Sequence, residues 1–170
     1  MRKSLDILFG ITSILAAVFL VMIALLILSQ SIGRLVGLVI PDANDLAGFC
    51  LAAGTFLALG PALRYGAHIR VLLVINQLHG TARRIMEGGT LLLAVFFAGY
   101  FTWWMGVLSQ ESFSYGDASA GVLAFPLWIP QSAMTFGLAM LTLALIEGLI
   151  DTLLGRPTVF ADRETSDMTE

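Results

Sequence analysis

The sequence predicts an all-α integral membrane protein, with four transmembrane helices and a short interfacial amphipathic helix between spans 2 and 3. Hydrophobic residues make up 58% of the 170 residues and charged residues only 12%, against roughly 45–50% and 25% in soluble domains. The excess falls in four long apolar blocks, each near the length of about 20 residues that a helix needs to cross a bilayer. We expect a single four-helix membrane domain over residues 1–155 and a polar cytoplasmic tail over residues 156–170.

The first span is expected at about residues 5–29. Arg2 and Lys3 precede an uncharged run of apolar character, as in a signal peptide, but the apolar core of a signal peptide is only about 7–15 residues long and a small-residue cleavage site follows it. The run here is longer and no such site follows, so we expect an uncleaved span. Asp6 lies three residues after Lys3, which favours a local ion pair between them.

The second span is expected at about residues 46–63, after a turn that begins at Pro41. Asn44 or Asp45 would be a natural N-cap for this helix. Gly54, Ala58 and Ala62 follow one another at four-residue spacing, which allows close helix packing in lipid. Packing of this face on another helix and exposure of it to lipid both stay open.

The central segment, residues 64–84, is expected to lie at a membrane face. Its apolar core, residues 69–75, is far too short to cross the bilayer. A strand there would leave backbone N–H and C=O groups at its edge without hydrogen-bond partners at membrane depth, so a helix is favoured. The segment contains four of the nine basic residues and both histidines, namely Arg64, Arg70, Arg83, Arg84, His68 and His79.

The third and fourth spans are expected at about residues 85–108 and 128–150. Tyr100, Trp103 and Trp104 gather toward the far end of the third span, as in the aromatic belt at a membrane interface. The loop between these spans is rich in Gly, Ser and Ala and contains two acids, Glu111 and Asp117, which we expect to be solvated.

The distribution of basic residues predicts the orientation. Four spans leave eight of the nine on one side and Arg34 alone on the other. The positive-inside rule then places both termini and the central segment in the cytoplasm.

The chemistry that the chain lacks narrows its function. No charged residue lies near the middle of a span, where transporters and proton relays usually have one. The single cysteine, Cys50, excludes an internal disulfide, a paired-thiol redox site and a Cys-built zinc site. The net charge of −3 does not suggest a nucleic-acid partner. We therefore expect no enzyme activity, no catalytic residue, no cofactor and no metal.

Four acids are expected at the cytoplasmic helix ends: Asp6, Glu87, Glu147 and Asp151. They are better explained as counterions of the arginine-rich segment than as a convergent site.

Two stretches resemble a known family. Residues 64–71, Arg-Tyr-Gly-Ala-His-Ile-Arg-Val, follow the second span, and the loop from Gly116 to Ser119 leads to residues 126–130, Pro-Leu-Trp-Ile-Pro. Together with the spacing of the four spans, over about residues 5–154, they resemble the small membrane subunit of TRAP transporters, the DctQ-like family of tripartite ATP-independent periplasmic transporters.

The resemblance implies a scaffold and docking subunit of a sodium-driven importer of an organic anion, commonly a carboxylate, in the bacterial inner membrane. Its partners would be a large multi-span TRAP membrane subunit, a periplasmic substrate-binding protein and the lipid bilayer. Contacts of the cytoplasmic segment with headgroups or partner would come from Arg64, His68, Arg70, Arg83 and Arg84. A periplasmic docking loop would be shaped by Gly116, Ser119, Pro126 and Trp128. Simple membrane anchoring and turn geometry stay open as alternatives for these residues.

Two other classes of function stay open. A homo-oligomeric small membrane channel or exporter would need polar residues facing a shared lumen, but the few hydroxyl residues of the spans form no obvious stripe (Thr12, Ser13, Thr55, Thr102, Thr135 and Thr142). A four-span membrane enzyme would need acids and basic residues converging on one face. The only set that qualifies is Glu147, Asp151, Glu87 and Arg84.

Overall fold

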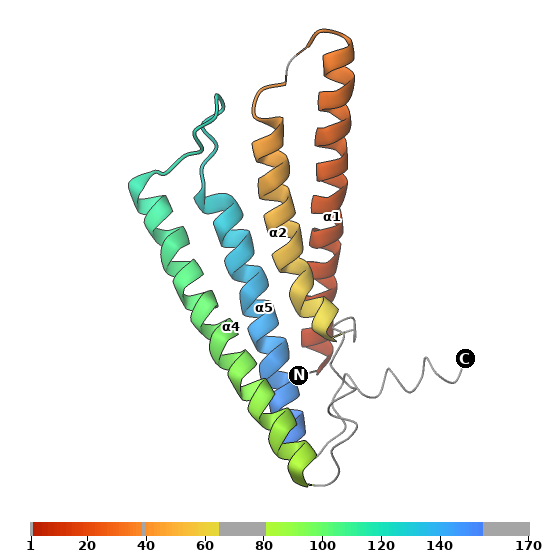
Figure 1. Ribbon diagram of the computed structural model, residues 1–170, viewed down its shortest axis with the longest axis vertical. Coiled ribbons are helices and arrows are strands. Elements are labelled where there is room, and N and C mark those ends of the chain that lie inside the picture. Colours follow the sequence, from red (N-terminus) through yellow and green to blue (C-terminus); the bar gives the residue numbers. More distant parts are fainter. Residues whose placement is uncertain (1, 39, 65–80, 155–170) are drawn as a thin grey trace, which may run out of the picture.

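The part of the chain that the structure describes folds as four long helices (Figure 1). The computed structural model describes residues 2–38, 40–64 and 81–154, and of these the side chains at 5–38, 40–64 and 86–154. The helices are α1 (Arg2–Leu35), α2 (Ala43–Arg64), α4 (Thr81–Tyr115) and α5 (Trp128–Leu153). All four are long and apolar enough to cross a membrane, which confirms the predicted fold class. Most of the expected interfacial helix and the expected tail lie outside the described residues.

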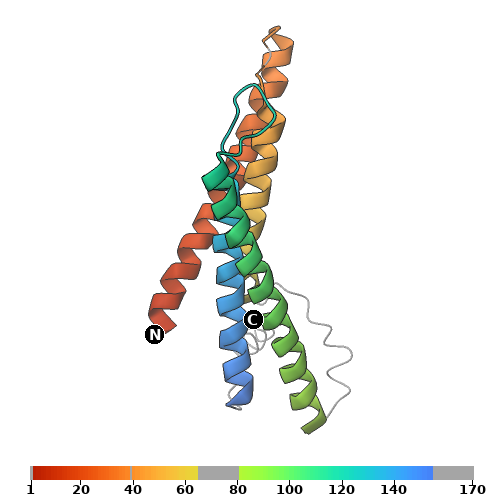
Figure 2. The same ribbon diagram turned by 90° about the vertical axis from the view of Figure 1, so that its left-hand side faces the viewer.

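The helices stand in a row rather than in a closed bundle. Their principal contacts join α1 to α2, α2 to α5, and α5 to α4 (Figure 1). In the view turned by 90°, α1 and α4 diverge at their lower ends while α5 lies between them (Figure 2). The inner pair is therefore formed by the second and fourth spans, which are not neighbours in the sequence.

The helices extend beyond the apolar runs that revealed them. The predicted spans lie within the four helices, but α1 continues to Leu35 and α4 to Tyr115. The predicted N-cap of α2 was wrong, because the helix begins at Ala43 and both Asn44 and Asp45 lie in its first turn. The carbonyl of Asp42 accepts the first bond of this helix, from the Leu46 N–H at 3.0 Å.

Burial separates the inner pair from the outer pair. In the most apolar stretch of each helix, 33% of the residues are buried in α2 and α5, against 11% in α1 and 6% in α4. The inner pair packs closely because Gly137 of α5 lies against the backbone of Phe56 and Leu57, where a Cβ atom would overlap it. Gly54 of α2 packs against Phe19 of α1, so this member of the small-residue face contacts a helix.

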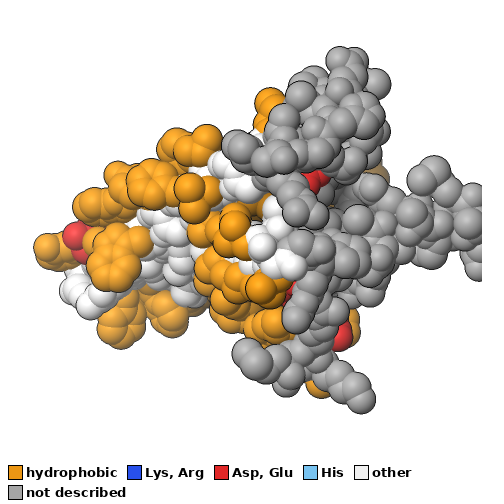
Figure 3. All heavy atoms as spheres, turned by 90° about the horizontal axis from the view of Figure 1, so that it is seen from below, with side chains coloured by type: hydrophobic (Ala, Val, Ile, Leu, Met, Phe, Trp, Pro, Cys, Tyr) orange, Lys and Arg blue, Asp and Glu red, His pale blue; other side chains and the backbone are white. Residues whose placement is uncertain are grey.

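The outer helices present large apolar side chains outward, among them Leu25 on α1 and Phe96 on α4, which are 61% and 64% exposed. In the space-filling view from below, hydrophobic side chains make up most of the described surface that is visible (Figure 3). Such a surface is suited to lipid or to the membrane-embedded face of another protein.

Candidate functional sites at the two ends of the helix row

One end of the row is organised around Arg64, the last residue of α2. At this end, called the Arg64 end below, α1 and α4 begin and α2 and α5 finish (Figure 1). Nη2 of Arg64 lies 2.8 Å from Oδ1 of Asp6 on α1 and 3.7 Å from Oε1 of Glu147 on α5. The guanidinium carbon lies 4.8 Å from the centre of the Phe9 ring. One cation therefore connects three helices.

The strength of these two ion pairs depends on how far each side chain is buried. Arg64 is only 5% exposed, and the side chain of Glu147 is 17% exposed, whereas that of Asp6 is 57% exposed. A guanidinium removed from water is costly unless carboxylates and a ring face compensate it. The pair with Glu147 should thus be stronger than its distance suggests, and the pair with Asp6 is screened by solvent. The cluster fixes the ends of α1, α2 and α5 relative to one another.

The predicted contact residues at this end divide into two groups. Arg64 faces helices of its own chain, and its expected contact with headgroups or a partner stays a prediction. His68 and Arg70 lie outside the described residues, as do the side chains of Arg83 and Arg84 in the first turn of α4. Of the acids that were expected to be counterions, Asp6 and Glu147 pair with Arg64. Asp151 is buried one turn after Glu147, at 5% exposure.

The opposite end contains the predicted docking loop between α4 and α5. Gly116 ends α4 with a φ of +70°, which a glycine adopts at no steric cost. Ser119 then pairs with Phe125: its N–H donates to the Phe125 carbonyl at 2.9 Å, and its hydroxyl accepts the Phe125 N–H at 3.0 Å. Ala118 forms an isolated antiparallel bridge with Pro126. The loop is a short hairpin whose tip is residues 120–124.

Asp42, in the loop between α1 and α2, contacts this tip. The Leu123 N–H donates a hydrogen bond to Oδ2 of Asp42. Gly121 lies beside the same carboxylate, and a Cβ atom there would overlap it. The two loops that join helices at this end, called the Asp42 end below, are therefore connected. No sequence pattern indicated this contact, because Asp42 follows Pro41 in the predicted turn and its partner Leu123 is 81 residues away in the sequence.

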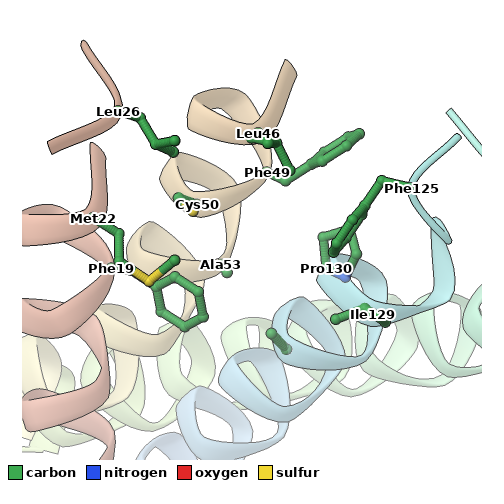
Figure 4. Close-up of a pocket in the computed structure, with 11 residues that line it drawn as sticks. Phe19, Met22, Leu26, Leu46, Phe49, Cys50, Ala53, Phe125, Ile129 and Pro130 are labelled. Carbon is green, nitrogen blue, oxygen red and sulfur yellow. The ribbon is translucent and has the colours of Figure 1, made fainter. Parts of the chain in front are cut away.

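An apolar cavity of about 310 Å³ lies beneath the loop, between α1, α2 and α5 (Figure 4). Phe49 of α2 and Phe125 of the loop stack at its edge, with ring centres 5.8 Å apart. Cys50 and Ala53 line the α2 side, and Pro130 lines the α5 side. The Phe125 side chain thus anchors the base of the loop on the helices.

Five threonine hydroxyls of the spans have hydrogen-bond acceptors within their own helices. Each of five threonines donates to a carbonyl three or four residues earlier: Thr12, Thr55, Thr102, Thr135 and Thr142. Thr102 and Thr142 also meet across α4 and α5, 3.1 Å apart, in an open groove that Gln110 lines as well. One of the two hydroxyls can donate to the other in place of its own carbonyl, so polar side chains of two neighbouring spans meet at this depth.

The described residues contain no group of three or more His, Cys, Asp and Glu side chains that could hold a metal ion. Three carboxylates connect parts of the fold. Asp6 and Glu147 pair with Arg64, and Asp42 accepts a hydrogen bond from a backbone amide. Fold and sites together define a multi-pass membrane protein whose described charged residues lie near the helix ends and in the loops.

The family model of the DctQ component of tripartite ATP-independent periplasmic transporters matches residues 22–155. This match covers more than half of the chain, and the chain belongs to the DctQ family. The predicted family is thereby confirmed. Members of this family are components of transporters, and the family is not one of enzymes. A comparison with curated proteins gave no match.

Proposed function

We propose that this chain is the small scaffold and docking subunit of a sodium-driven TRAP transporter that imports an organic anion, such as a carboxylate. The large membrane subunit would carry the sodium and substrate sites, and a periplasmic binding protein would deliver the substrate. The chain itself would perform no catalysis and bind no cofactor. It would lie in the bacterial inner membrane with both termini in the cytoplasm.

The family match is the observation that carries this proposal, since it covers residues 22–155. The placement of charge supports it. Moving an ion or a carboxylate across a bilayer requires polar groups at depth, whereas the described ion pairs of this chain lie at the Arg64 end. A subunit that supports another protein needs no such groups.

The two ends would then have different environments. With the termini in the cytoplasm, the Arg64 end faces the inner leaflet, and Arg83, Arg84, His68 and Arg70 would contact headgroups or the large subunit there. The Asp42 end faces the periplasm, and the loop with Gly116, Ser119, Pro126 and Trp128 would contribute to docking of the binding protein. The apolar outer faces of α1 and α4 are available to the large subunit and to lipid.

Reconstitution tests the proposal. Liposomes would contain this chain with the large membrane subunit of the same transporter, and the purified binding protein would be added outside with a labelled carboxylate. We expect uptake under an inward sodium gradient, none under an equal potassium gradient, and none when this chain is omitted. Full uptake without this chain, or uptake without any cation gradient, would contradict the proposal. Uptake by this chain alone would instead favour the homo-oligomeric channel or exporter.

A further inference from the structure

The Asp42 end contains a contact that the proposed docking role does not by itself require. Asp42 belongs to the turn between α1 and α2, yet its carboxylate accepts the Leu123 N–H at the tip of the other loop. Hydrogen bonds to a charged acceptor are about twice as strong as neutral ones. The position of the tip is therefore set by a residue outside the loop.

The fit around this carboxylate is tight. Gly121 leaves no room for a side chain beside Asp42. Each loop also contains a residue other than glycine at a positive φ, +56° at Asp42 and +43° at Ala124, and this angle is unfavourable for alanine. Such angles persist only where surrounding contacts determine them. The contact between the loops supplies that constraint.

The base and the tip of the loop are held separately. At the base, Phe125 stacks on Phe49 and is bonded to Ser119, so the loop stays on the helices without Asp42. At the tip, Val122 and Leu123 are 82% and 56% exposed. Loss of the Asp42 bond would free the tip and leave the base in place.

The tip has access to water. The apolar part of α1 that is long enough to cross a membrane contains 31 residues and rises about 46 Å at 1.5 Å per residue, more than the roughly 30 Å of a hydrocarbon core. Because the Asp6–Arg64 pair belongs at the membrane surface, the excess length projects at the Asp42 end. Exposed apolar side chains outside the hydrocarbon core are typical of protein-binding surfaces.

We infer that Asp42 is a positioning residue that fixes the tip of the docking loop, so that the docking surface for the binding protein is built from both loops of the Asp42 end. This inference rests on the proposed docking function. Asp42 acts through the backbone of Leu123 and need not touch the binding protein itself.

The test uses the complex of this chain with its large subunit in lipid nanodiscs and the purified binding protein of the same transporter. We expect Asp42→Ala to weaken docking on the order of tenfold, as expected for the loss of a hydrogen bond to a charged group. Asp42→Asn keeps an acceptor oxygen and should fall between Asp42→Ala and the unmodified chain. Gly121→Ala should weaken docking without changing any charge. Asp45→Ala removes an exposed acid one turn away and should leave docking unchanged.

Two further readouts separate positioning from general damage. In the uptake assay, Asp42→Ala should raise the KM for the loaded binding protein and leave the maximal rate unchanged. Hydrogen exchange should accelerate at residues 121–124 and remain unchanged at residues 128–150. Equal docking by Asp42→Ala, Gly121→Ala and the unmodified chain would overturn the inference, as would unchanged exchange at the tip. If the unmodified complex does not bind the binding protein, the proposed docking function fails, while the exchange measurement still decides whether Asp42 fixes the tip.

Discussion

The two ends of the helix row are held by different kinds of contact. At the Arg64 end, charged side chains from three helices meet around a buried arginine, since Arg64 is only 5% exposed. At the Asp42 end, one carboxylate accepts a hydrogen bond from a backbone amide of a neighbouring loop. The first kind of contact ties helices that cross the membrane, and its loss affects the whole row. The second shapes a surface loop, and its loss is local.

The largest effect is expected from Arg64→Ala, because it leaves Glu147 partly buried without its cation. Breaking a buried pair from one side costs about 3–5 kcal/mol. We expect about 2–3 kcal/mol here, since Asp6 is exposed and solvent screens it. Thermal unfolding in detergent would measure the loss. Arg34→Ala removes an exposed arginine near the other end of α1 and should not change stability. If Arg64→Ala and Arg34→Ala unfold at the same temperature, the charge cluster does not stabilise the helix row, and the difference described between the two ends is wrong.

Gly137→Ala tests whether the two ends depend on the same inner pair. A Cβ atom at this position overlaps the Phe56 backbone, and overpacking of this kind costs about 1–3 kcal/mol. We expect a lower unfolding temperature and faster hydrogen exchange at both ends. Gly10→Ala on α1 is the matched control, because nothing lies within 4 Å of the added atom. Disturbance of only one end would mean that the ends are organised independently.

Ser119→Ala should act at the Asp42 end alone. It removes the acceptor of the Phe125 N–H, and the net worth of such a bond is about 1 kcal/mol. Amide exchange at residues 124 and 125 should therefore quicken while the unfolding temperature stays nearly constant. Ser114→Ala, which removes a bond to a carbonyl of its own helix, is the control. A large fall in the unfolding temperature would show that the loop supports the whole row.

The smallest effect is expected from Thr142→Val. It removes the contact with Thr102, and hydrogen bonds between membrane helices average about 0.6 kcal/mol. We expect a barely measurable change in stability and unchanged uptake by the reconstituted complex. Loss of uptake would give the groove between α4 and α5 a role in conduction, and would favour the homo-oligomeric channel.

The sequence predicted those parts of the fold that depend on local composition. Four apolar runs revealed four helices, and Gly116 and Ser119 marked the loop after α4. The order of helices in the row could not be predicted, since α2 and α5 meet through Gly137 and a backbone distant in the sequence. The same reason hid the partner of Asp42. Asp6 and Glu147 were expected as counterions of the arginine-rich segment, but the sequence could not show that both of them, from α1 and α5, pair with Arg64.

Helix ends were also difficult to place from sequence. The continuation of α1 to Leu35 and of α4 to Tyr115 passes through polar residues such as Arg34 and Gln110. Hydropathy marks where the bilayer ends but not where the backbone stops being helical. The cap of α2 was misplaced because Asp42, at a positive φ, directs its carboxylate to another loop instead of to its own helix.

If this chain works as a subunit of a larger transporter, a tagged copy purified from its native membrane in mild detergent should bring its partner with it. We predict that mass spectrometry of such a pulldown finds a much larger multi-span protein in about equal amount. Recovery of the chain only with copies of itself would contradict the proposed role.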